Sequence, residues 1–135
     1  MNLFILRHGI AVERGAPGYA NDSDRPLTPE GEHKLQLIAQ AIQALEPGFD
    51  LILSSPYLRA RQTAEIVAGV LGLCKKLDFS YTLMPDGSTR RLVEVLSRLR
   101  PAPESVLLVG HEPYLSGLIS LLVSGGETCA VALKK

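Results

Sequence analysis

Cysteine is scarce in this sequence, which contains only Cys74 and Cys129. The two lie far apart, with no CxxC pair and no histidine at ligand spacing, so a cysteine-based zinc site is excluded. We expect two free thiols, buried or partly buried, in a reducing cytosol.

Long apolar runs are also missing. The first run, within residues 2–6, meets Arg7 after four apolar residues, which is too short for the core of a signal peptide. No later run reaches the length of a membrane span. We therefore expect a cytoplasmic protein that has no membrane partner.

The chain has no excess of either charge, because 14 lysines and arginines balance 14 aspartates and glutamates. This balance argues against the broad basic surface that nucleic-acid binding needs, so no nucleic-acid partner is expected. Arginines that cluster locally in a neutral protein instead favour a small anion such as phosphate or sulfate.

Short apolar runs alternate with stretches of helical periodicity. The runs predict strands at residues 2–6, 50–53, 105–109 and 129–133, with a short one within 75–89. Helices are predicted at about 29–45, 56–71, 88–99 and 115–122. This alternation predicts a three-layer α/β/α sandwich with a mostly parallel sheet. With no repeat or linker, residues 1–135 are expected to form one domain, completed by a further C-terminal segment after Lys135.

Reactive side chains follow three of the predicted strands. Arg7 and His8 come after the first strand, Arg59 follows the second closely, and His111 follows the third. In open α/β sheets this edge binds ligands. Gly9 permits a sharp turn, which would let Arg7 and His8 share one site although neighbouring strand residues normally point to opposite faces.

The two strand-end histidines suit phosphoryl chemistry. The His8 imidazole can attack phosphorus if one ring nitrogen is unprotonated while the other donates, for instance to a backbone carbonyl. His111 could donate to a phosphoryl oxygen, especially if protonated, or could instead cap the last helix. His33 lies mid-helix beside charged residues and is expected at the surface.

Arg59 is placed on the first turn of the second helix, where free N–H groups and the helix dipole already favour an anion. Arg61 lies about 200° further round that helix, so both cannot face one pocket. We assign Arg59 inward because Gln62 and Thr63, at helical spacing from it, are polar and could line a cleft; Arg61 is then solvated. Such cationic groups stabilise a transferring phosphoryl group, and we expect no metal and no cofactor.

Four motifs in order resemble the histidine phosphatase superfamily, also called phosphoglycerate mutase-like. They read Leu-Arg-His-Gly at 6–9, Arg-Pro-Leu-Thr-Pro-Glu-Gly at 25–31, Ser-Ser-Pro-Tyr-Leu-Arg-Ala-Arg-Gln-Thr-Ala at 54–64 and Val-Gly-His-Glu-Pro at 109–113. The short chain and the Arg-Pro-Leu-Thr variant are most similar to the SixA-type phosphohistidine phosphatases. The resemblance implies a phosphoglycerate mutase-like fold.

The resemblance also implies a phosphohistidine intermediate on His8. Arg7, Arg59 and His111 would then form the phosphate pocket, together with Gly9. The implied substrate is a phosphohistidine-bearing protein, such as a phosphotransfer domain of a two-component relay.

Arg25 has two interpretations that the sequence leaves equal. By resemblance it contacts the phosphoryl group or the substrate protein. Alternatively it is a loop residue that forms a salt bridge with Asp22 or Asp24.

One departure from the superfamily pattern concerns the general acid. Many members place a glutamate after the third strand, whereas residues 83–87 here read Leu-Met-Pro-Asp-Gly. Asp86 could substitute, although Pro-Asp-Gly is first of all a turn sequence. A missing acid matters less for phosphohistidine, which releases neutral imidazole once its ring is protonated. The alternatives are a small-molecule phosphomonoesterase that uses Asp86, and a non-catalytic phosphoprotein-binding module.

Overall fold

Four parallel strands form one sheet in the computed structural model, which describes residues 1–45, 48–126, 131 and 133. The strands are β1 (Asn2–Arg7), β2 (Leu51–Ser54), β3 (Leu77–Phe79) and β4 (Ser105–Gly110). They lie in the order β1-β4-β2-β3, and each pair of neighbours is parallel. The parallel sheet is therefore confirmed, whereas the strand expected at 129–133 falls mostly outside the described residues.

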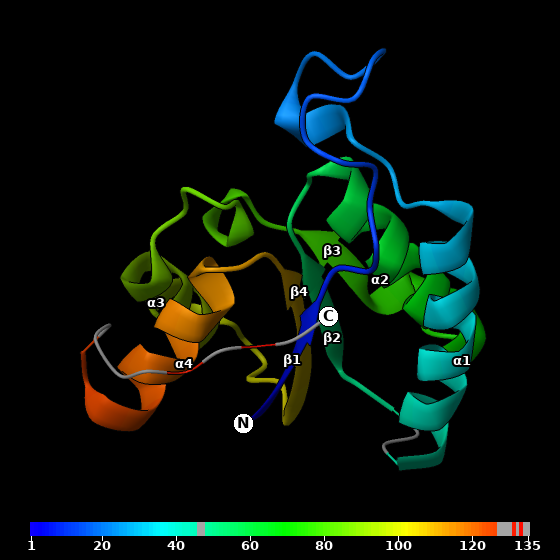
Figure 1. Cartoon of the computed structure of the whole chain (residues 1–135). Helices are drawn as coiled ribbons and strands as arrows, with labels where there is room; N and C mark the ends of the chain where they lie inside the picture. The colour runs from blue at the N-terminus through cyan, green and yellow to red at the C-terminus, as the bar shows by residue number, and fades with distance from the viewer. Residues whose placement is uncertain (46–47, 127–130, 132, 134–135) are drawn as a thin grey trace.

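Helices cover both faces of this sheet. Figure 1 shows α1 (Pro29–Leu45) and α2 (Leu58–Leu71) on one side, with α3 (Thr89–Arg98) and α4 (Tyr114–Ser124) on the other. The three-layer sandwich is thus confirmed. Within the described part of the chain, no helix combines the length and the apolar character needed to cross a bilayer.

The position of β4 inside the sheet, between β1 and β2, explains why its sequence is an unbroken apolar run. Its residues alternate between the two faces, and both faces are covered. Leu107 and Val109 belong to the core beneath α1 and α2, while Val106 and Leu108 belong to the core beneath α3 and α4.

The helix starts follow the capping residues. The Thr28 hydroxyl accepts a hydrogen bond from the Gly31 N–H at 3.0 Å before α1, and the Ser88 hydroxyl accepts one from the Arg91 N–H at 3.3 Å before α3. Both caps satisfy N–H groups that have no partner inside the helix.

Two details of the sequence prediction are wrong. In α1 the buried positions recur every four residues, and Ile38 and Leu45 are 43% and 85% exposed, because the helix packs mainly along one ridge against α2. Cys74 is an exposed free thiol, because α2 ends at Gly72 and the chain then runs over the surface in the 3-10 turn η2 (Cys74–Lys76). Cys129 lies outside the described residues.

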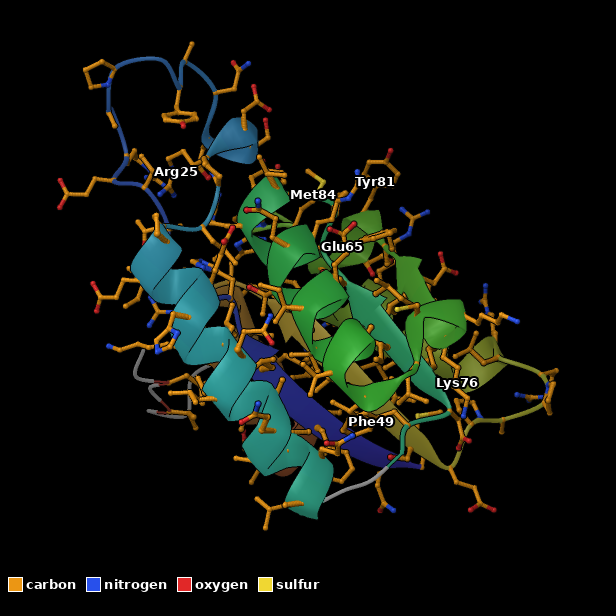
Figure 2. The ribbon with its side chains drawn as sticks, turned by 90° about the vertical axis from the view of Figure 1, so that its right-hand side faces the viewer. Arg25, Phe49, Glu65, Lys76, Tyr81 and Met84 are labelled. Carbon is orange, nitrogen blue, oxygen red and sulfur yellow. The ribbon has the colours of Figure 1, made fainter. Side chains whose placement is uncertain are left out.

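The chain between β1 and α1 forms a long loop beyond the carboxyl ends of the strands (Figures 1 and 2). It contains one short 3-10 turn, η1 (Asp22–Asp24). Figure 2 shows Arg25 at the base of this loop, near the start of α1. The loop therefore lies at the sheet edge where the sequence placed the site.

Candidate active site

A polar cavity of about 360 Å³ lies at this edge of the sheet. It is lined by four arginines, two histidines, two glutamates, an alanine and a proline: Arg7, Arg14, Arg25, Arg59, His8, His111, Glu13, Glu112, Ala11 and Pro85. The structure thus brings together the five side chains that the sequence proposed as the nucleophile and the phosphate-binding groups.

His8 follows β1 directly and is buried. Its Nδ1 lies 2.7 Å from the Gly9 carbonyl oxygen, and its Nε2 lies 3.2 Å from Nε of Arg59. A carbonyl only accepts and a guanidinium only donates, so Nδ1 carries the proton and Nε2 carries the lone pair. His8 is therefore a neutral imidazole, held in one tautomer by a backbone carbonyl.

Gly9 makes this arrangement possible through close packing. A Cβ at this position would lie 2.6 Å from Cδ1 of Leu35 on α1, closer than real Cβ contacts. The backbone N–H of Gly9 donates to the Thr63 hydroxyl of α2 at 3.1 Å. Gly9 therefore serves through its small size and not through a left-handed turn, and the segment after β1 is held between α1 and α2.

Arg59 is on the first turn of α2 and is 3% exposed. Besides the bond to His8, its Nη1 donates to the Asp22 carbonyl at 2.7 Å and its Nη2 donates to the Asp22 carboxylate at 2.9 Å. Burial lowers the pKa of Arg59, but arginine stays protonated. Arg61 is exposed and pairs with Glu65 at 2.8 Å, so the predicted orientations of the two arginines are confirmed.

Gln62 and Thr63 do not line the cavity as the sequence suggested. The Gln62 side chain accepts from the Leu27 N–H at 2.8 Å, and the Thr63 hydroxyl accepts from Gly9. The two polar residues fasten the segments on either side of the long loop to α2.

His111 follows β4 and is 1% exposed. Its Nε2 lies 2.8 Å from the Ser55 hydroxyl, while its Nδ1 has no hydrogen-bond partner in the described residues. Burial, and next the charge of Arg59, lower the pKa of His111 to about 3, so the ring is neutral and not the imidazolium considered from the sequence. The side-chain cap at the start of α4 comes instead from the Glu112 carboxylate, which accepts from the Ser116 N–H at 3.2 Å.

The Ser55 hydroxyl accepts from the Tyr57 N–H at 3.3 Å and lies 2.8 Å from Nε2 of His111, to which it can donate its own hydrogen. In that tautomer the imidazole proton is on Nδ1, the nitrogen without a hydrogen-bond partner among the described residues.

Arg25 forms the salt bridge that the second interpretation predicted: its Nε and Nη2 donate to the Asp22 carboxylate at 2.9 and 2.7 Å. The residue also lines the cavity, and its contact with a phosphoryl group or a substrate protein stays a prediction. Asp24 is not its partner, because that carboxylate accepts from Asn21 and Ser23.

Arg7 and Asp86 have contrasting positions. Arg7 lines the cavity; its Nη1 donates to the Leu133 carbonyl at 2.9 Å, and its buried Nε has no partner among the described residues. Asp86 is exposed and is not part of the cavity wall, which its neighbour Pro85 joins. The Gly87 N–H bonds to the Met84 carbonyl at 2.9 Å, so the segment is a turn, and the role of Asp86 as an acid stays a prediction.

Sequence reasoning missed Ser55 and Tyr57. The Tyr57 ring lies 5.4 Å from the ring of His111 and 5.3 Å from the guanidinium carbon of Arg59. Both residues precede Arg59 within the motif at 54–64, and this closeness in sequence to Arg59 is the feature that could have identified them as site residues.

In the described ranges, no three His, Cys, Asp or Glu side chains are grouped to hold a metal ion.

Comparison with known proteins shows the family to which the chain belongs. The model of the histidine phosphatase superfamily (branch 1) matches residues 3–81. Phosphohistidine phosphatase SixA of Escherichia coli (strain K12) is 34% identical over 93% of this chain and 76% of its own length. An uncharacterized protein of Picosynechococcus sp. is 43% identical over the whole chain and 81% of its own length.

A solved structure extends the similarity to three dimensions. The protein histidine phosphatase SixA complexed with tungstate superimposes with a TM-score of 0.82 at 31% identity, covering 98% of this chain and 83% of that one. The chain belongs to the histidine phosphatase superfamily and has the phosphoglycerate mutase-like fold of its SixA members.

Proposed function

We propose that this chain is a phosphohistidine phosphatase that takes the phosphoryl group of a histidine-phosphorylated protein onto its own His8. The observation that carries the proposal is the hydrogen bonding of His8, with Nδ1 at 2.7 Å from the Gly9 carbonyl and Nε2 at the Arg59 guanidinium. The bond to the Gly9 carbonyl leaves the lone pair of a neutral imidazole on Nε2, beside an arginine-lined cavity, and this lone pair can attack phosphorus once it gives up the hydrogen bond from Arg59.

The proposed reaction has two balanced steps. In the first, Nε2 of His8 forms a bond to phosphorus while the P–N bond to the substrate breaks, and a substrate ring already protonated on its other nitrogen leaves as neutral imidazole. In the second, water attacks the phosphorus of phosphorylated His8. Its oxygen and both hydrogens leave in H₂PO₄⁻, and His8 returns to the neutral form.

The other cavity groups bind the phosphoryl oxygens in this scheme. Arg7, Arg25 and Arg59 supply N–H donors whose planar forks match those oxygens. His111 donates from Nδ1 in its neutral form, so it needs no uptake of a proton. These donors are aimed before the charge spreads over the oxygens, which is the main electrostatic contribution to such a transfer.

The nature of the leaving group supports phosphohistidine over a phosphomonoester. An alcohol must receive a proton as it leaves, and Asp86, the acid that the sequence suggested, is not on the cavity wall, whose two carboxyl groups belong to Glu13 and to Glu112, the cap of α4. Protonated phosphohistidine needs no such acid. The similarity to SixA of Escherichia coli supports the same substrate class, and a phosphotransfer domain of a two-component relay is the partner that we propose.

We further propose that the reaction is independent of metal ions, because the arginines supply the positive charge that a metal would bring. Two apolar cores on opposite faces of one sheet support a single domain over residues 1–135. The cytoplasmic location stays a prediction.

The experiment compares hydrolysis of a histidine-phosphorylated phosphotransfer domain with hydrolysis of p-nitrophenyl phosphate, in wild type and in Asp86→Ala. The proposal expects the phosphoprotein to be turned over at least a hundredfold faster in kcat/KM, with no change on Asp86→Ala. Fast ester hydrolysis that Asp86→Ala abolishes would instead identify a phosphomonoesterase. Anion binding without turnover of either substrate would identify a binding module.

A further inference from the structure

Three of the four arginines on the cavity wall share one carboxylate. Arg14, Arg25 and Arg59 all donate to Asp22, which belongs to the 3-10 turn η1 in the long loop. Asp22 is not itself part of the cavity wall. The carboxylate therefore contacts these guanidinium groups without occupying the space in which an anion would bind.

The contacts of Asp22 are divided between its oxygens. One carboxylate oxygen accepts from Arg14 at 3.2 Å and from Nε and Nη2 of Arg25 at 2.9 and 2.7 Å. The other accepts from Nη2 of Arg59 at 2.9 Å, and the backbone carbonyl accepts from Nη1 of Arg59 at 2.7 Å. With Nε bonded to His8, every nitrogen of Arg59 has a partner, and the plane of its guanidinium is fixed.

Arginine has five N–H groups, so these three bonds leave two N–H groups of Arg59 for a ligand. Because the fork is planar and rigid, fixing one edge aims the remaining hydrogens. The orientation that Asp22 imposes on Arg59 thus sets where a phosphoryl oxygen can bind.

The charge of Asp22 also keeps the arginines together. Arg59 is 3% exposed, so water screens its repulsion with Arg25 poorly, and an adjacent negative charge is needed to hold both side chains in place. Burial alone would raise the pKa of Asp22, but the hydrogen bonds from Arg25 and then Arg59 lower it to about 2. Asp22 is therefore a counter-ion at neutral pH and not a proton donor.

We propose that Asp22 is a positioning residue of the anion site, acting through Arg59 and Arg25 and fastening the long loop to α2 as it does so. This inference rests on the proposed function only in assuming that the cavity binds a phosphoryl group. A carboxylate that merely filled an empty phosphate site would lie in the cavity, and its removal would strengthen anion binding. The two roles therefore predict opposite changes in anion affinity when the carboxylate is removed.

The test measures tungstate binding to the full chain by isothermal titration calorimetry. Asp22→Asn keeps the size but loses the charge, and it is expected to weaken tungstate binding at least tenfold. Asp22→Glu keeps the carboxylate and is expected to stay within threefold of wild type. The matched control is Asp24→Asn in the same turn, whose carboxylate accepts from Asn21 and Ser23 and should leave binding unchanged.

A double-mutant cycle separates positioning from a general effect on the loop. In an Arg59→Lys background the planar fork is gone, so Asp22→Asn should weaken tungstate binding by a smaller factor than in wild type, because only the part exerted through Arg25 remains. Melting temperatures are recorded in parallel, and if Asp22→Asn does not fold, retained binding in Asp22→Glu still supports a role for the carboxylate.

Several results would overturn the inference. They are unchanged or tighter binding in Asp22→Asn, an equal loss in Asp22→Glu or Asp24→Asn, and an undiminished effect of Asp22→Asn in the Arg59→Lys background. Tungstate binding needs no substrate, so this outcome is independent of whether phosphohistidine is hydrolysed. The proposed function can fail while Asp22 keeps its role, and the reverse also holds.

Discussion

At the scale of single residues, the hydroxyl of Ser55 connects the second histidine to the strand end. Ser55→Ala removes the bond to Nε2 of His111 and leaves both ring nitrogens of a buried imidazole without a partner in the described chain. We expect the variant to lose about 1–3 kcal/mol in the free energy of unfolding and about tenfold in kcat/KM.

Denaturant unfolding and steady-state kinetics test this expectation together. The matched control is Ser54→Ala, since that buried hydroxyl bonds to the Ser55 carbonyl and not to a histidine. If Ser55→Ala retained full kcat/KM, the serine would have no part in orienting His111.

The buried neutral state of His111 predicts a dependence of stability on pH. Burial lowers its pKa from 6.5 to about 3, so between these values the unfolded chain binds a proton that the folded chain excludes. The free energy of unfolding should therefore fall as the pH drops below about 6.5, by up to about 1.4 kcal/mol per pH unit from this residue.

Urea unfolding between pH 7 and 4 measures that slope. His111→Gln lacks the titrating group and should show a shallower fall over the same interval. Equal slopes in the two proteins would mean that His111 is already protonated in the folded state.

Single-residue roles were predictable where strand ends and helix spacing decide them. The carbonyl partner of His8 and the inward orientation of Arg59 follow from those local rules. The sharing of Asp22 between Arg25 and Arg59 does not, because it depends on the path of a long loop that no periodicity describes. For the same reason, the sequence alone did not decide between the two roles of Arg25.

At the scale of elements, the start of α1 is packed against the segment that follows β1. A Cβ at Gly31 would lie 2.2 Å from the backbone oxygen of Ile10, which has no side-chain freedom to move away. Gly31→Ala should cost about 1–3 kcal/mol in stability and displace the segment that carries His8.

Gly69→Ala is the matched control for that substitution. Gly69 is an exposed residue of α2 with no atoms within 4 Å of an added Cβ, so alanine should stabilise the helix by up to about 1 kcal/mol. Thermal unfolding of both variants tests this expectation, with a lower melting temperature for Gly31→Ala than for Gly69→Ala as the predicted result. Equal melting temperatures would show that the contact at Gly31 is not tight.

Most elements were predictable because their signals are local. The β4 run is apolar on both faces, and the hydroxyls of Thr28 and Ser88 mark helix starts. The burial pattern of α1 could not be predicted in the same way, because it depends on the neighbour against which the helix packs. Ile38 is exposed for that reason, although its helical spacing suggested burial.

At the scale of the whole molecule, a neutral chain concentrates four arginines around one cavity. This positive charge should serve where other phosphatases use a metal ion. We expect treatment with EDTA followed by desalting to leave the rate of phosphohistidine hydrolysis unchanged. A loss of tenfold or more that added Mg²⁺ restores would contradict that expectation.

The central claim, transfer of phosphate to His8, is tested most directly by trapping the intermediate. Enzyme mixed with a ³²P-phosphohistidine protein is quenched during turnover, and the label bound to this chain is measured in wild type, His8→Ala and the surface control His33→Ala. The account predicts acid-labile, base-stable label in wild type and His33→Ala and none in His8→Ala. Label that persists in His8→Ala, or turnover by that variant at the wild-type rate, would contradict it.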